Sequence, residues 1–430
     1  MKMVFIDKIS GEQMKKLVQR PAIKMDRVFA LVKPILADVK KNGDVAVRKY
    51  SRKFDSVEIK NPLVSVAEME KAIKGVGVEV RQALKIAAGN IEKFHREQLK
   101  KEKAVETMTG IKCWRETRDI ERVGFYIPRG LVSTVLMLGV PAKIAGCQEI
   151  VMCTPLDKTG QIAPEMLLAA KIAGIKKVFK IGGAQAIAAM AYGTQTVPKV
   201  NKIFGPGNQF VMAAKMLVSI DPEGAAIDLP AGPSEVLVIG DSAANPAFVA
   251  ADLLSQAEHG PDSQVILATN SQKLAQATAK EIKRQMTGLP ERARKTAALA
   301  LRNALFIITG SLDRAVDFAN LYAPEHLILN IKNPERYVAK IKNAGSVFLG
   351  PYSPESAGDY ASGTNHILPT SGWAKSYGGV SVDSFVKKIS FQKLNKQGLD
   401  KIAKAIAVLA DIEQMPAHKN AVKVRTTKLC

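Results

Sequence analysis

Apolar runs of strand length alternate with helical patterns over most of the chain. A first series predicts strands followed by helices, with strands at 122–127, 149–153, 177–181 and 202–204 and helices at 133–145, 163–173, 184–192 and 208–218. A second series predicts strands at 235–239, 264–268, 305–308, 326–329 and 346–349, with helices that begin near Pro246 and Ser271. Strands that alternate with helices usually pair in parallel. The pattern therefore predicts two doubly wound α/β sheets rather than a bundle or a sandwich.

The flanking segments show other patterns. Residues 30–88 have apolar positions three and four apart, which predicts helices that could pack on the second sheet. Glycine, serine, proline and tyrosine are frequent in 353–379, which predicts long ordered loops of the kind that carry function. A last helix is expected at 399–413, and Pro416 is expected to end it.

Composition narrows the classes of protein that this sequence allows. The 430 residues are 47% hydrophobic and 24% charged, which excludes disorder and fits a globular chain with two or three cores. The longest apolar stretches, such as 131–140, are much shorter than the roughly 20 residues that cross a bilayer, so we expect no membrane segment. Four cysteines without a CxxC pair do not form a disulfide scaffold. We therefore expect a cytoplasmic protein.

The formal net charge of +22 allows several interpretations. It could reflect nucleic-acid binding, an anionic ligand or a lysine-rich surface. Nucleic-acid binders usually concentrate basic residues together with exposed aromatic ones, whereas here the lysines are scattered and only 6% of the residues are aromatic. We therefore expect no nucleic-acid partner.

Two potential metal ligands share one end of a predicted helix. An Asn-Pro pair at 245–246 starts this helix and a Gly-Pro pair at 260–261 ends it. Gln256 and His259 are three residues apart, so they lie on one face near the helix C-terminus. A histidine that only caps the helix is an open alternative.

Two further candidate ligands, Asp359 and His418, occur in weakly charged segments. With Gln256 and His259 they form a set of one aspartate, two histidines and an amide oxygen, which suits zinc or a similar divalent ion. Spacing alone does not show that the four residues meet. His95 lies in a charged helical run, and we expect it to be solvated at the surface.

Glu325 and His326 form a second constellation, directly before an apolar strand. Sites of α/β proteins gather at sheet edges of this kind. A carboxylate beside an imidazole supplies two groups that can exchange protons near neutral pH. The alternative is a solvated acid and histidine on a loop.

Two glycine-containing turns each follow a predicted strand and open a helix. They are 182–185 (GGAQ) and 205–208 (GPGN), and their backbone amides are available for phosphate groups. Neither turn has the GxGxxG pattern, so tight βα turns without a ligand are the alternative. A polar lead-in rich in glycine and proline, 228–235 (DLPAGPSE), precedes the first strand of the second series.

Several motifs in one order resemble the histidinol dehydrogenase family, and the resemblance covers nearly the whole chain. They are DLPAGPSE at 228–235, QAEHGP at 256–261, APEHL at 323–327, GDYASGTNH at 358–366 and AHKNAV at 417–422. One departure is Arg129, which stands where the family usually has glycine. Arginine lacks the backbone range of glycine, and it could contact a phosphate.

The resemblance implies roles for individual residues. It implies a Zn²⁺ site formed by Gln256, His259, Asp359 and His418, with His418 contributed by the neighbouring subunit of a homodimer. It implies Glu325 and His326 as the catalytic pair. The implied substrate contacts are Ser234, Gln256, His259, His326, Asp359, His366, Glu413 and His418. The implied NAD contacts are Tyr126, Gln185 and Asn208.

The resemblance also implies a fold and a domain organisation. The family has two doubly wound Rossmann-like domains of the aldehyde-dehydrogenase-like superfamily, with small N- and C-terminal arms. We accordingly expect an arm at 1–22, a zinc-binding catalytic domain formed by 23–121 and 236–372, an NAD-binding domain at 122–235 and a dimer-swapped tail at 373–430.

The implied activity is zinc-dependent oxidation of L-histidinol to L-histidine through L-histidinaldehyde, with two NAD+, at the end of histidine biosynthesis. One alternative is a family relative that oxidises another polar alcohol with NAD. Another is a basic nucleic-acid-binding protein that keeps an inactive dehydrogenase fold.

Overall fold

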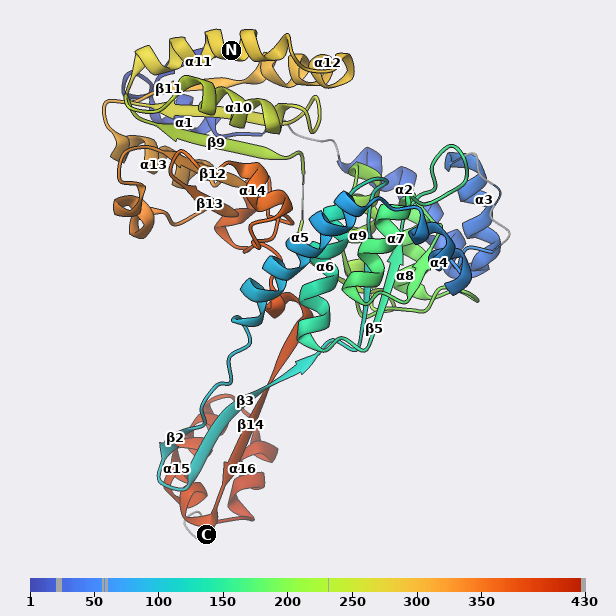
Figure 1. Cartoon of the computed structure of the whole chain (residues 1–430). Coiled ribbons are helices and arrows are strands. Elements are labelled where there is room, and N and C mark those ends of the chain that lie inside the picture. Colours follow the sequence, from blue (N-terminus) through green and yellow to red (C-terminus); the bar gives the residue numbers. More distant parts are fainter. Residues whose placement is uncertain (21–24, 56–57, 59–60, 231, 427–430) are drawn as a thin grey trace.

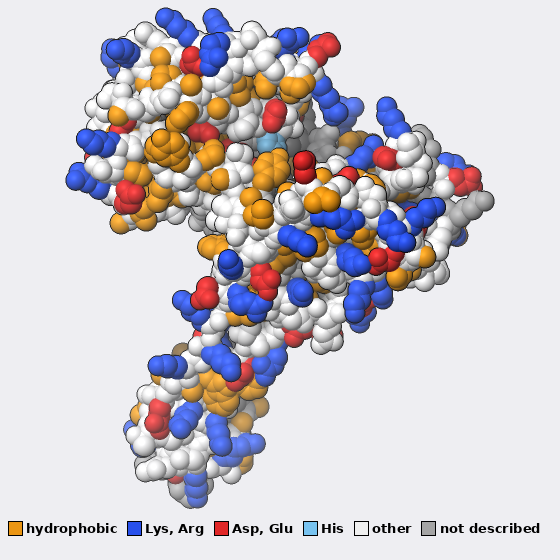
Figure 2. Space-filling view, in the orientation of Figure 1, with side chains coloured by type: hydrophobic (Ala, Val, Ile, Leu, Met, Phe, Trp, Pro, Cys, Tyr) orange, Lys and Arg blue, Asp and Glu red, His pale blue; other side chains and the backbone are white. Residues whose placement is uncertain are grey.

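The computed structural model describes residues 1–20, 25–55, 58, 61–230 and 232–426. The expected domain boundary at 22–23, Ala231 of the 228–235 motif and Cys430 lie outside these ranges. Figure 1 shows three parts: a body around β9 to β13, a second body that contains β5 and α6 to α9, and a narrow tail that ends at the C-terminus. Lys and Arg side chains are spread over all three parts in Figure 2.

A five-stranded parallel sheet forms one body. Its order is β6-β5-β4-β7-β8, with β4 at Arg122–Tyr126, β5 at Glu149–Cys153, β6 at Lys177–Phe179, β7 at Lys202–Phe204 and β8 at Ala226–Ile227. The connecting helices are α6 (Val132–Ala145), α7 (Pro164–Ala173), α8 (Gly183–Tyr192) and α9 (Gln209–Ser219). The strand order changes direction between β4 and β7. A crevice at such a switch point is the usual ligand site of an open α/β sheet.

A six-stranded parallel sheet forms the other body. Its order is β1-β11-β10-β9-β12-β13, with β1 at Lys2–Phe5, β9 at Glu235–Gly240, β10 at Gln264–Thr269, β11 at Leu305–Ile308, β12 at His326–Asn330 and β13 at Ser346–Leu349. Its helices are α1 (Gly11–Leu17), α10 (Pro246–Ala257), α11 (Gln272–Met286), α12 (Glu291–Ala300) and α13 (Leu312–Tyr322). Buried side chains of α10, α11 and α12 pack on one face, and those of α13 pack on the other. The predicted α/β fold class with two parallel sheets is confirmed.

The N-terminal helices cover the five-stranded sheet. They are α2 (Met25–Asn42), α3 (Asp44–Asp55), α4 (Val66–Lys74) and α5 (Val78–Arg96). The first two pack with α8 and α9, and the last two pack with α6 and α7. The expectation that these helices could pack on the second predicted sheet, which is the six-stranded one, is therefore wrong. Their apolar faces pack against the helices of the five-stranded sheet instead. The grouping of 23–121 with 236–372 stays a prediction, and this packing does not favour it.

His95 is buried, so the expectation that it is solvated is wrong. Its side chain is 0% exposed, and Nδ1 lies 2.9 Å from the carbonyl oxygen of Ile91. The charged neighbours of His95 in sequence point elsewhere, whereas Leu84, Ala88 and Ile91 lie on the same buried face of α5.

The tail is built on an antiparallel sheet that the sequence patterns did not predict. Its order is β14-β3-β2, with β2 at Val105–Met108, β3 at Ile111–Asp119 and β14 at Val386–Leu394. It carries α15 (Lys396–Ile412) and α16 (Pro416–Lys423). Pro416 begins α16, because proline is well tolerated in the first turn of a helix. The preceding helix already ends at Ile412.

The stretch 353–379 is mostly loop, as predicted, but it contains the short helix α14 (Glu355–Tyr360). In the described ranges, no helix is long and apolar enough to span a bilayer.

Candidate active site

Glu325 and His326 lie where α13 turns into β12. The helix ends at Tyr322, Ala323 adopts a left-handed conformation with φ 55°, and the chain enters the strand at His326. The sheet buries both side chains, which are only 6% and 4% exposed. The alternative of a solvated pair on a loop is thereby excluded.

The backbone of Glu235 holds both side chains. Its N–H donates to Glu325 Oε2 at 2.8 Å, and its carbonyl oxygen lies 3.1 Å from His326 Nδ1. A neutral imidazole that donates from Nδ1 carries its lone pair on Nε2. Within the described chain, His326 Nε2 has no hydrogen-bond partner, so it is available to accept a proton.

Four ionisable groups meet here, the pair included. His326 Nδ1 lies 3.6 Å from Glu325 Oε2 and 3.7 Å from Glu355 Oε1, and His326 Nε2 lies 3.5 Å from Asp359 Oδ1. Burial lowers the pKa of His326, but the carboxylates of Glu355, Glu325 and Asp359 outweigh it and raise that pKa to about 10. Burial raises the pKa of Glu325 to about 7 and that of Glu355 to about 8. Burial also opposes ionisation of Asp359, but its contact with His326 lowers its pKa overall.

A candidate metal cluster adjoins the pair. One ligand atom from each of His259, Glu355 and Asp359 lies within 4.8 Å of the other two. The fold thus brings two of the predicted ligands together, and it adds Glu355, which no sequence motif singled out. In the amide orientation that satisfies its contacts, Gln256 donates to Glu355 Oε1 at 3.0 Å and to the carbonyl oxygen of Glu235 at 3.3 Å. The third predicted ligand therefore touches the cluster.

The other predicted substrate residues divide into two groups. His366 belongs to the site: its Nδ1 lies 2.7 Å from the carbonyl oxygen of Asp359, and its Nε2 lies 2.9 Å from Thr134 Oγ1. His418 and Glu413 are exposed residues of the tail, on α16 and at the end of α15. Figure 1 shows this tail pointing away from α14. Within one chain, these two residues do not reach the cluster.

The three predicted NAD contacts line one cavity of about 640 Å³. Tyr126 ends β4, Gln185 is in the first turn of α8, and Asn208 caps α9, so they surround the switch point of the five-stranded sheet. The hydroxyl of Tyr126 accepts a hydrogen bond from the N–H of Gly183 at 3.2 Å. Side chains of α2 and α3 form the opposite wall, among them Asp55. Arg129 also lines this cavity.

A buried ion pair supports the turn before Asn208. Lys215 Nζ contacts Asp228 Oδ1 at 2.5 Å and donates to the carbonyl oxygen of Gly205 at 2.8 Å, while Asp228 Oδ2 accepts from the N–H of Gly205. Gly205 has φ +113°, and a Cβ there would collide with the carbonyl oxygen of Tyr126. The glycine is thus required by both conformation and space.

A second cavity, of about 480 Å³, lies between the cavity of the predicted NAD contacts and the candidate metal cluster. Asn208 borders both cavities, and Ser234 and His259 line the second one. Figure 2 shows the surface hollowed where the two bodies meet. A ligand in the cofactor cavity could therefore extend toward the metal cluster.

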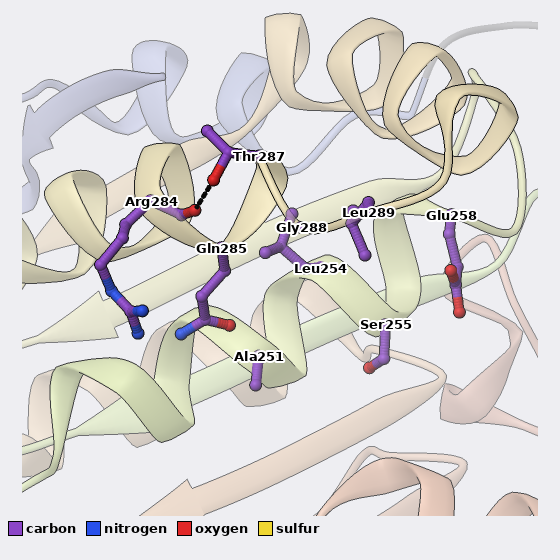
Figure 3. A pocket seen from close by; sticks show the side chains of 9 residues that line it. All are labelled: Ala251, Leu254, Ser255, Glu258, Arg284, Gln285, Thr287, Gly288 and Leu289. Atoms are coloured by element: carbon purple, nitrogen blue, oxygen red, sulfur yellow. Dashed lines mark hydrogen bonds between the residues drawn. The ribbon is translucent and has the colours of Figure 1, made fainter.

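Another cavity, of about 560 Å³, lies between α10 and α11 (Figure 3). Its lining includes Ser255, Glu258 and Gln285 but none of the predicted site residues. Its cation, Arg284, is paired with Glu281 at 2.8 Å. Its lining contains neither the buried pair of Glu325 and His326 nor a residue of the candidate metal cluster.

A buried acid–imidazole pair and a cavity at the switch point of a parallel sheet are typical of an α/β enzyme. The family model described as histidinol dehydrogenase matches residues 18–426, and the chain belongs to that family. A histidinol dehydrogenase of Bacteroides thetaiotaomicron is 53% identical over 423 residues, 98% of each chain. The chloroplastic histidinol dehydrogenase of Arabidopsis thaliana is 47% identical, over 99% of this chain and 91% of that one. The crystal structure of histidinol dehydrogenase from Elizabethkingia anophelis has a TM-score of 0.95 and 50% identity, and the match covers 99% of this chain and 98% of that one.

Proposed function

We propose that the protein oxidises L-histidinol to L-histidine through L-histidinaldehyde, at one site, with two molecules of NAD+ and a zinc ion. The observation that carries this proposal is the buried pair of Glu325 and His326, which lies beside the candidate metal cluster. A cavity lined by Ser234 and His259 links the cluster to the cofactor side. Family membership supports the choice of alcohol and of cofactor.

The donor set fits a divalent ion of zinc type. Imidazole and carboxylate groups are ordinary zinc ligands, and Glu355 Oε2 is buried without a hydrogen-bond partner in the described chain. We assign the ligands to Gln256, His259 and Asp359, with His418 of the partner subunit, and Glu355 orients Gln256. A bound zinc ion would hold the imidazole and amino nitrogens of the substrate and offset the local carboxylate charge.

Tyr126, Gln185 and Asn208 would bind NAD+ at the switch point, where the N-termini of α8 and α9 point into the cavity. NAD+ supplies the hydride acceptor in each step. Arg129 adds a positive charge at the rim. Burial raises the pKa of Asp55 in the same cavity, the charge of Arg129 opposes that shift, and the guanidinium would contact a phosphate of NAD+.

His326 would act, in its neutral form, as the base of the first oxidation; because the surrounding carboxylates raise its pKa to about 10, this form is favoured at alkaline pH. Its Nδ1–H is held by the carbonyl oxygen of Glu235, so Nε2 is the atom that accepts the proton of the alcohol while hydride leaves the carbon. A fixed ring with one defined lone pair keeps this proton transfer aligned.

Glu325 would act in the second oxidation. The aldehyde must be hydrated before it can lose another hydride, and the Glu325 carboxylate takes a proton from the attacking water while His326 again accepts protons. Burial raises the pKa of Glu325 to about 7, so its basicity suits a proton exchange near neutral pH. Ser234, His366 and the partner's Glu413 complete the substrate contacts.

A homodimer would bring the tail of one subunit to the site of the other. The exposed apolar side chains of α15 and the following turn support this arrangement, with Leu409 59%, Ile412 72% and Met415 47% exposed. Exposed apolar residues grouped in this way mark association surfaces. We also propose that the protein acts in the cytoplasm.

A substrate panel separates this function from oxidation of another polar alcohol. NADH formation would be followed with L-histidinol, L-histidinaldehyde and amino alcohols that lack an imidazole, before and after removal of metal. We expect kcat/KM to be highest for the two imidazole compounds, and activity to be lost on chelation and restored by zinc. A higher kcat/KM for an alcohol without imidazole would support the alternative.

A further inference from the structure

The side chain of Glu235 is a buried carboxylate that no proposed catalytic step uses. It is 0% exposed, yet Arg20 binds it through two parallel hydrogen bonds, Nε to Oε1 at 2.9 Å and Nη2 to Oε2 at 2.8 Å. The N–H of Ser371 donates a third hydrogen bond to Oε1, also at 2.9 Å. Removing a carboxylate from water is costly unless it is paired in this way.

Arg20 also contacts the segment that leads to the catalytic pair. Its Nη2 lies 3.3 Å from the carbonyl oxygen of Ala323, and its guanidinium stacks on the ring of Tyr322 at 3.5 Å from the centroid. Ala323 has the left-handed backbone conformation that directs the chain into β12, a conformation that costs energy in a residue with a side chain. One guanidinium therefore links β9 to the turn before Glu325.

We infer that Arg20 is a positioning residue: by fixing Glu235 against the Tyr322–Ala323 turn, it sets the backbone N–H and C=O that hold Glu325 and His326. The chain of contacts runs from the guanidinium to the Glu235 carboxylate, and from the Glu235 backbone to Glu325 Oε2 and His326 Nδ1. The planar fork of arginine is required, because a lysine cannot bind both carboxylate oxygens and stack on Tyr322 at once. This inference rests on the proposed roles of Glu325 and His326.

Kinetics of Arg20 variants test this role. In Arg20→Ala, we expect kcat for L-histidinol to fall about a hundredfold, because small misplacements of reacting groups cost this much, while KM and zinc content change less than about threefold. Guanidinium chloride at low millimolar concentration should restore part of kcat, and Arg20→Lys should restore less than the guanidinium ion does. Lys16→Met is the matched control, since Lys16 is an exposed residue of the same N-terminal segment and, within the described residues, its ammonium pairs only with Glu12.

Ring-nitrogen NMR tests the geometry without turnover. The chain has five histidines, so the ¹⁵N-labelled imidazoles can be resolved, and His326→Gln assigns the signal of His326. We expect the Nδ1–H of His326 to give a hydrogen-bonded signal in the wild type, and that signal to shift or broaden in Arg20→Ala but not in Lys16→Met.

The outcomes separate the two proposals. Unchanged kcat and an unchanged His326 signal in Arg20→Ala would overturn the positioning role, as would a loss of kcat that follows unfolding and is not rescued. A wild-type protein without L-histidinol oxidation would refute the proposed function, and the NMR result would then still decide whether Arg20 fixes the His326 ring.

Discussion

His326 Nε2 lies 3.5 Å from Asp359 Oδ1, so the proposed base and a proposed metal ligand are direct neighbours. His326 belongs to β12, whereas Asp359 belongs to α14 in a loop-rich segment of the chain. In the proposed mechanism, metal binding and proton transfer would therefore be coupled through this contact.

Asp359→Asn should reduce zinc content to less than a tenth and reduce kcat by at least a hundredfold, because a charged ligand is lost. Metal analysis of the purified variant and NADH assays would measure both effects. Glu258→Gln is the control: Glu258 is the neighbour of His259 in sequence, but it is exposed and lines the cavity between α10 and α11. Equal zinc content in the two variants would remove Asp359 from the ligand set.

The shared site predicts complementation between subunits. His418→Ala homodimers should lose both zinc and activity. Homodimers of the doubly substituted variant, Glu325→Gln with His326→Gln, should also lose activity. After subunit exchange in an equal mixture, half of the dimers are mixed, and one of the two sites in each mixed dimer has a complete set of residues. Activity should therefore return to about a quarter of the wild-type value. An inactive mixture, with subunit exchange demonstrated by mass spectrometry, would contradict a tail that serves the partner's site.

Gly205→Ala should damage the cofactor turn. The added Cβ meets the carbonyl oxygen of Tyr126 and also strains a φ of +113°, so we expect a loss of about 2 kcal/mol or more in the free energy of unfolding and a KM for NAD+ raised at least tenfold. Gly130→Ala controls for strain alone, since Gly130 has φ +80° and open space around its Cβ position. Calorimetry and NAD+ titrations would show whether the two variants differ as expected.

His95 should make stability depend on pH. Burial lowers the pKa of His95 below its ordinary 6.5, so as pH falls below 6.5 the unfolded chain binds a proton before the folded chain does. The free energy of unfolding should therefore decrease from pH 7 to pH 5.5 by more in the wild type than in His95→Met. Urea unfolding of the metal-free proteins at both pH values would measure the difference, and parallel curves would show that His95 is not involved.

The βα alternation predicted most of the fold. Buried parallel strands are nearly continuous apolar runs, as in Val236 to Ile239, and side-chain caps such as Asn208 and Asn245 mark helix starts, so both signals are local. The tail sheet lacks this signal. β3 and β14 carry charged residues on both faces and are largely exposed, so their pairing across more than 250 positions leaves no apolar pattern.

The candidate site was predictable only in part. The motifs named Glu325, His326, His259 and Asp359, and the fold brings these four together. Glu355 was missed because one glutamate in a loop-rich stretch carries no pattern, and its burial follows from contacts between distant segments. His95 shows the opposite error, since the helical spacing from Leu84 to Ile91 already placed it on a buried face.

The most direct test of the account is the ratio of NADH to L-histidine formed from L-histidinol by the zinc-loaded protein. We predict two molecules of NADH for each L-histidine, and almost none from zinc-free protein or from His326→Gln. An absence of NADH with zinc bound, or one NADH per L-histidinol with the aldehyde as the final product, would contradict it.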